Sequence, residues 1–165
     1  MIKRIVVGSD GSGHAQHAVT WAASLAAQLN AEVVLVHVTE PFLPSITYAG
    51  AFVPYVPQEF IDEQCAALQK QVVTELAAPL IDAGIRWQAR IIEGVASRVI
   101  PEVAREFGAP LIVVGARGLN SVGELILGST SHNLIRHAHL PVVVVPLAAA
   151  VRKSRHNVVQ LPVPA

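Results

Sequence analysis

The sequence predicts an α/β fold in which a doubly wound parallel sheet carries helices on both faces. Runs rich in β-branched residues alternate along the chain with segments of helical periodicity. Several of these runs are almost continuously apolar, which is typical of parallel strands covered on both sides. A chain of 165 residues also suits one domain with a sizeable core.

Five runs are predicted to be strands because β-branched residues dominate them and glycine or proline bounds most of them. In chain order they are residues 2–8, 32–38, 86–92, 111–115 and 141–145. Since helical segments separate them, the strands should be joined by crossover connections and run parallel.

Helical spacing of apolar residues places the predicted helices between these strands. The first covers residues 14–29 and presents a face made mostly of alanine, which lets a helix lie close to a sheet. The second follows the apolar series from Ile61 to Leu80, and Pro79 should kink or end it. Val99, Val103 and Phe107 mark the third, and the last covers residues 129–138.

Two segments fall outside this alternation. Residues 41–58 contain four prolines and one glycine, and a long irregular loop of this kind often forms a functional lid. Residues 147–165 carry basic residues and prolines and are predicted to be a C-terminal tail, or an arm onto a partner. The domain organisation is therefore a domain at 1–146 and a tail at 147–165.

Composition excludes several classes of protein. Formal net charge is zero and no long basic stripe occurs, which argues against a nucleic-acid binder. The longest apolar stretch, 140–151, is interrupted by Pro141 and Pro146 and does not predict a membrane span. No signal peptide precedes Ile2, so we expect a cytoplasmic protein. Only 15% of residues are charged, against about 25% typically, which favours self-association.

Two loops have the composition of a ligand site, and both follow predicted strands. In a doubly wound sheet, ligands bind beyond the carboxyl ends of the strands, where the strand order reverses. The first loop is residues 8–13, which begins with Gly8 and contains Asp10. The second is residues 115–118, which leads on to residues 128–130.

The second loop carries the stronger signal for an anion. Glycines such as Gly115 and Gly118 let the backbone approach a phosphate. Gly128, Ser129 and Thr130 then open a helix, whose N-terminus offers unpaired N–H groups and two hydroxyls. Taken singly, each residue is better explained as a strand end or a helix cap. Together, on one loop system after a buried strand, they favour anion binding. Ser129 stands where a Walker A loop requires lysine, so that motif is excluded.

Several polar residues can be interpreted either as ligand-binding residues or as structural ones. Asp10 could accept the hydroxyls of a ribose, or form an Asx turn that caps the next helix. Arg117 could pair with phosphate charge or point into solvent. His37, at the end of the second predicted strand, is assigned to packing. The pairs His14/His17 and His137/His139 have spacings that suit a metal, but solvated or capping roles are favoured and no metal site is predicted.

The spacing Gly115-x-x-Gly118-x9-Gly128-Ser129 resembles the nucleotide-binding signature of the ATP-binding universal stress proteins, G-x-x-G-x9-G-(S/T). The resemblance extends to VVGSDGS after the first strand, to LVHV in the second and to LPVVVVP at the fifth, and covers about residues 2–146. It implies a five-stranded parallel sheet of order 3-2-1-4-5 and a dimer. It also implies that Asp10 holds the ribose, that backbone near Val38 meets the adenine, and that the glycines and Ser129 bind phosphates.

The sequence therefore predicts a regulatory, stress-response protein that binds ATP with Mg²⁺ bridging the phosphates. Its fifth strand is an uncharged sheet edge, so we expect a homodimer through that edge. Hydrolysis of ATP should be slow at most. Two alternatives stay open: a dimeric interaction protein without nucleotide, and an adenine nucleotide α-hydrolase-like enzyme.

Overall fold

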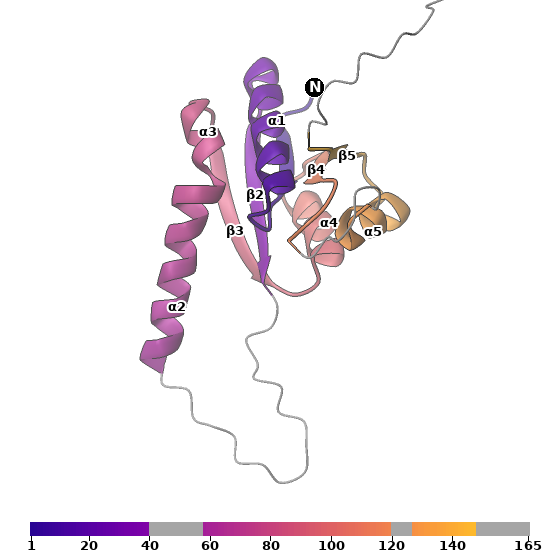
Figure 1. Cartoon of the computed structure of the whole chain (residues 1–165). Coiled ribbons are helices and arrows are strands. Elements are labelled where there is room, and N and C mark those ends of the chain that lie inside the picture. The colour runs from indigo at the N-terminus through magenta and orange to yellow at the C-terminus, as the bar shows by residue number, and fades with distance from the viewer. Residues whose placement is uncertain (40–57, 120–126, 148–165) are drawn as a thin grey trace, which may run out of the picture.

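The computed structural model describes residues 1–39, 58–119 and 127–147, and it contains one five-stranded sheet (Figure 1). All neighbouring strands pair in parallel, in the order β3-β2-β1-β4-β5. The strands are β1 (Arg4–Gly8), β2 (Glu32–Thr39), β3 (Trp87–Glu93), β4 (Ile112–Gly115) and β5 (Val142–Val145). The predicted fold class and strand order are confirmed.

Helices cover both faces of the sheet, and each face has its own apolar core. The α-helices are α1 (Gly13–Leu29), α2 (Gln58–Gln71), α3 (Ala78–Asp82), α4 (Ala96–Glu106) and α5 (Ser129–His137). One core joins α1 and α3 to the sheet, and the other joins α4 and α5 to its opposite face. Successive residues of β2 alternate between these cores, Leu35 in the first and Val36 in the second.

The alanine face of α1 packs as its sequence predicts. Ala18, Ala22 and Ala26 are fully buried against the sheet. Ser12 caps the helix, because its Oγ accepts a hydrogen bond from the N–H of Ala15 at 3.2 Å. At the other end Asn30 adopts φ 51°, and its N–H bonds back to the last carbonyls of α1.

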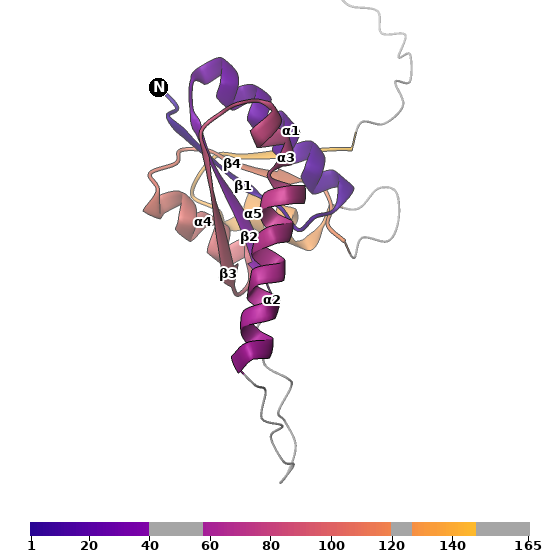
Figure 2. The same ribbon diagram turned by 90° about the vertical axis from the view of Figure 1, so that its left-hand side faces the viewer.

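The single helix expected from Ile61 to Leu80 is divided into three parts. After α2 the chain forms a π-helical turn, η1 (Val72–Leu76), and then the short α3. Pro79 lies in the first turn of α3, where a helix needs no N–H from that residue. Both views show that α2 extends past the carboxyl ends of β2 and β3 (Figures 1 and 2). The predicted loop 41–58 and tail 147–165 lie, except for Gln58 and Leu147, outside the described residues.

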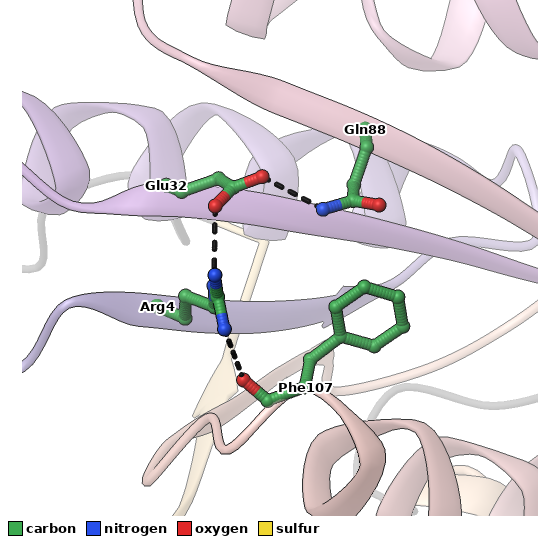
Figure 3. A network of polar contacts seen from close by, with 4 residues as sticks. All are labelled: Arg4, Glu32, Gln88 and Phe107. Carbon is green, nitrogen blue, oxygen red and sulfur yellow. Dashed lines mark hydrogen bonds and ion pairs between the residues drawn. The ribbon is translucent and has the colours of Figure 1, made fainter.

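A polar network closes the amino end of the sheet, opposite the end where ligands are expected (Figure 3). The Nε of Arg4 donates to Glu32 Oε2 at 3.1 Å, and Gln88 Nε2 donates to Glu32 Oε1 at 2.7 Å. The Nη1 of Arg4 also donates to the carbonyl of Phe107 at 2.9 Å. These contacts tie β1, β2 and β3 to the end of α4.

The hydrogen bonds from Gln88 and Arg4 hold the pKa of Glu32 below its ordinary value of 4.5. A carboxyl with a lowered pKa in the folded state stabilises the protein above its unfolded pKa, and that contribution disappears as the pH falls through the folded value. We therefore expect Glu32→Gln to lower the free energy of unfolding at neutral pH, and the difference from wild type to shrink below pH 4.5. Urea unfolding of both proteins, from neutral pH to below pH 4.5, measures this difference in the free energy of unfolding. The exposed Glu63 on α2 provides the control variant, Glu63→Gln; a gap for Glu32→Gln that stays constant with pH would contradict the assignment.

Candidate nucleotide site

The two predicted loops meet at the carboxyl edge of the sheet. Strands β1 and β4 are neighbours, with Gly8 opposite Val114, so the residues that follow them leave the sheet side by side. The chain connects β1 to β2 on one side and reaches β4 on the other, which makes this the point where the strand order reverses.

Asp10 joins the two loops directly. Its Oδ1 accepts a hydrogen bond from the N–H of Ser12 at 3.0 Å, and its Oδ2 accepts one from the N–H of Leu119 at 3.0 Å. The first bond is the Asx turn that the sequence left open as an alternative. The second bond crosses between the loops, and the side chain stays half-buried. A carboxylate has about four acceptor positions, and these two hydrogen bonds use two of them.

The turn that carries Asp10 depends on glycine. Gly11 adopts φ +83°, a backbone conformation that residues with a side chain rarely adopt. This conformation lets the chain enter α1 directly after β1. Ser9, before Asp10, is only 6% exposed, and its N–H donates to the carbonyl of Val36 on β2 at 3.0 Å. The turn is therefore held to β2 at its start and to α1 at its end.

Gly115 leaves room for the start of α1, and Gly118 leaves room for Asp10 of the first loop. A Cβ on Gly115 would lie 2.7 Å from the carbonyl carbon of His14 and 2.9 Å from the nitrogen of Ala15. A Cβ on Gly118 would lie 2.5 Å from Asp10 Oδ2. The close approach of α1 and the position of the carboxylate therefore both require glycine in the second loop.

Gly128 brings the start of α5 against the same loop. A Cβ there would lie 3.2 Å from the Cα of Arg117 and 3.5 Å from the nitrogen of Gly118. Gly128 is the N-cap of α5, and no side chain caps the helix. The N–H of Gly128 donates to the carbonyl of Ala116 at 2.8 Å. The next three amides, of Ser129, Thr130 and Ser131, have no partner within the helix by its geometry and face its N-terminal end.

Three other predicted site residues lie apart from these contacts. Gly8 faces the core, because a Cβ there would lie 2.7 Å from Ile100 Cδ1. The Val38 side chain packs against the core of α4 and α5. Arg117 is half-exposed and next to Gly128, and no ion pair of its guanidinium is found in the part of the chain that the structure describes.

This chain is similar to known proteins in both sequence and fold. The sequence model of the universal stress protein family matches residues 1–146. The chain belongs to the universal stress protein family.

Individual members agree. A universal stress protein of Bacillus subtilis is 30% identical over 149 residues, covering 88% of this chain and 99% of that protein. A family member from Burkholderia pseudomallei, whose structure is solved, is 31% identical with a TM-score of 0.63, over 88% of this chain and 97% of that one. A universal stress protein solved in complex with cAMP is 25% identical with a TM-score of 0.64, again over 88% and 97%.

Two polar residues of this universal stress protein have roles that the sequence analysis did not assign. Ser131 is only 2% exposed, and its Oγ lies 3.1 Å from the carbonyl of Ala116 and 2.9 Å from that of Gly128. A hydroxyl in the first turn, three residues after the N-cap, is the signal that would have identified it. His37, assigned to packing, places Nδ1 2.8 Å from the carbonyl oxygen of Ser9.

Neither a metal cluster nor a membrane helix is found in the described ranges 1–39, 58–119 and 127–147. No group of three or more His, Cys, Asp or Glu side chains there is arranged to hold a metal ion. None of the helices in that part of the chain combines the length and apolar character that crossing a bilayer needs.

Gly115→Ala should destabilise the protein by about 1–3 kcal/mol, because the new methyl group would overlap the backbone of His14 and Ala15 and α1 would have to move. Gly13→Ala is the matched control: its Cβ would meet only Leu147 Cδ1, at 3.9 Å, and should leave stability nearly unchanged. Thermal and urea unfolding of both variants measure the difference. Equal stability of the two would show that the close approach of α1 is not needed.

Proposed function

We propose that this universal stress protein is a regulatory, stress-response protein that binds ATP at the carboxyl edge of its sheet. One arrangement carries the proposal: the uncapped start of α5 lies against the loop 115–118, beside the carboxylate of Asp10. Free amides and a positive helix end suit phosphates, and a half-buried carboxylate suits ribose hydroxyls. The two groups are linked through Leu119 and Gly118, so one ligand of nucleotide size spans both.

Each part of the nucleotide has a proposed partner. The ribose hydroxyls donate to the acceptor positions of Asp10 that Ser12 and Leu119 leave available. The phosphates accept from the first amides of α5 and from the hydroxyls of Ser129 and Thr130, with Arg117 alongside. The adenine meets the backbone near Val38, at the end of β2.

The comparison with known proteins supports an adenine nucleotide as the ligand class. The universal stress protein solved with cAMP shares 25% of its residues with this chain and covers most of it. The cyclic nucleotide carries one phosphate; the glycine spacing of residues 115–129, which resembles that of the ATP-binding members, supports a triphosphate for this chain. We also propose that the protein acts in the cytoplasm.

Magnesium fits this site as an ion that arrives with the triphosphate. Mg²⁺ is commonly held by substrate phosphates, waters and one or two protein oxygens. The hydroxyls of Ser129 and Thr130 are the protein oxygens offered beside the phosphate position. The ion would neutralise phosphate charge in a protein whose formal net charge is zero.

Replacing Ser129 by Asp separates phosphate binding from helix stability. A carboxylate in the first turn of α5 interacts favourably with the helix dipole, so thermal stability should hold or rise. The same charge repels phosphates, so affinity for ATP should fall roughly tenfold or more, while affinity for adenosine changes little.

Calorimetry of the purified chain, with Mg²⁺ and with EDTA, measures both affinities, and Ser129→Asn is the control of similar shape. If Ser129→Asp binds ATP as wild type does, the phosphates lie elsewhere. If wild type binds no adenine nucleotide at all, the alternative of a nucleotide-free interaction protein is favoured. Conversion of ATP at enzymatic rates would favour the α-hydrolase-like alternative.

We also propose that the protein forms a homodimer through β5. This strand ends the sheet order and pairs only with β4 within the described chain. The carbonyls of Pro141 and Val145 accept hydrogen bonds from β4, so alternation turns the backbone groups of Val142 and Val144 toward the open edge. Pairing of two such edges about a two-fold axis would satisfy both.

Val144→Pro removes the N–H that faces the open edge and should shift the protein from dimer to monomer. Val144→Thr keeps the N–H and the β-branched shape and should remain dimeric. Analytical ultracentrifugation at micromolar concentration measures the masses, and circular dichroism checks the fold. A wild-type chain that is monomeric throughout, or a Val144→Pro variant that remains dimeric, would contradict pairing through this edge.

A further inference from the structure

We propose that His37 is a positioning residue, which holds the Ser9–Asp10 peptide so that the Asp10 carboxylate is aimed for ligand binding. The inference rests on the proposed nucleotide site and adds to it a residue that touches no part of the ligand in our assignment. The observation behind it is the contact of 2.8 Å between His37 Nδ1 and the carbonyl oxygen of Ser9.

The chemistry of this contact fixes the state of the ring. A carbonyl oxygen only accepts hydrogen bonds, so Nδ1 must carry the hydrogen. In the neutral imidazole the other nitrogen, Nε2, is then an acceptor without a hydrogen. The contact therefore selects the Nδ1–H tautomer of His37.

Packing alone gives no reason for an imidazole at this position. His37 lies on the same face of β2 as Leu35, where an apolar side chain fills the space against the core of α1 and α3. A leucine at position 37 would supply similar apolar surface. The property that histidine adds is the N–H directed at the carbonyl of Ser9.

That carbonyl is one half of a clamp around Ser9. The N–H of Ser9 donates to the carbonyl of Val36 at 3.0 Å. The C=O of Ser9 accepts from the ring of His37, which follows Val36 on β2. Adjacent residues of β2 thus fix both ends of a residue that is 6% exposed. Because the carbonyl belongs to the Ser9–Asp10 peptide, holding it sets the orientation of that peptide plane and the direction in which the Asp10 side chain leaves.

The direction of the Asp10 side chain matters because its carboxylate contacts residues on both sides of the site. Its carboxylate reaches the N–H of Ser12 and the N–H of Leu119, both at 3.0 Å. A rotation of the preceding peptide would move the carboxylate away from Leu119, and the position of any ribose bound to it would change as well. His37 therefore acts on the ligand site through Asp10.

The first test needs no ligand and uses the full chain. Long-range ¹H–¹⁵N spectra of the wild-type histidine rings, in the neutral form, should show the proton of His37 on Nδ1. Exchange of the Ser12 and Leu119 amides should be faster in His37→Leu than in wild type. A neutral ring protonated at Nε2, or unchanged exchange of both amides, would overturn the proposal.

Three variants test the link to binding. His37→Leu should weaken ATP binding about tenfold, the upper range for one lost hydrogen bond. His37→Asn should retain most of the affinity, because its amide nitrogen comes near the position of Nδ1. His137→Leu, at the exposed last turn of α5, is the matched control and should bind as wild type does.

A double-mutant cycle asks whether His37 acts through Asp10. In the Asp10→Ala background, His37→Leu should cause no further loss of affinity, because the group it positions is gone. A full additional loss would overturn the proposal. Should wild type bind no nucleotide, the proposed function fails, while the tautomer and amide exchange still decide whether the clamp exists. Should His37→Leu not fold, the wild-type tautomer and His37→Asn decide.

Discussion

The close approach of α1 to the end of β4 is the constraint on which the candidate site depends. At Gly115 the backbone of His14 and Ala15 comes so near that a Cβ would lie within 2.7–2.9 Å of it. This contact brings the turn after β1 beside the loop after β4. In this arrangement the carboxylate of Asp10 reaches the N–H of Leu119, the residue that follows the second loop, at 3.0 Å. The small residues of the α1 face, above all Ala18 and Ala22, allow the same helix to lie close to the sheet along its length.

The Asp10 carboxylate has a structural role and a proposed role in ligand binding. It accepts hydrogen bonds from the N–H groups of Ser12 and Leu119, which order the two loops relative to one another. A bound ribose would use its other acceptor positions, so the loops need not separate for the ligand to enter. Since the carboxylate is already oriented by protein groups, binding costs less conformational entropy at this residue than it would for a free side chain. Because Leu119 directly follows Gly118, the position of the Asp10 carboxylate is coupled to the loop 115–118, and the proposed ribose and phosphate positions would be coupled in the same way.

The sequence predicted the sheet and its helices well because their signals are local. Continuous β-branched runs and alanine spacing are properties of single segments, and they placed every strand within about two residues. The break at Val72–Leu76 was missed, since apolar spacing runs through the π-helical turn without interruption and Pro79 marks only the start of α3. The contact of His37 was missed for a different reason, because it depends on a carbonyl oxygen 28 residues away and nothing near position 37 indicates that Ser9 lies beside it. For Ser131, its place in the first turn of α5 indicates the bond to Gly128 but not the bond to Ala116, which belongs to another loop.

The glycine spacing that first indicated a nucleotide site has an explanation within the protein itself. Gly115 accommodates α1, Gly118 accommodates Asp10, and Gly128 accommodates the backbone of Arg117 and Gly118. In this chain the three glycines therefore serve the packing of these loops, apart from any ligand. The glycines therefore explain a geometry, and the proposed ligand has to be argued from other groups. Those groups are the first amides of α5, which have no partner within the helix, and the carboxylate of Asp10. For this reason a charge at Ser129 is a sharper probe of the ligand than a side chain at Gly118, whose first effect would fall on Asp10.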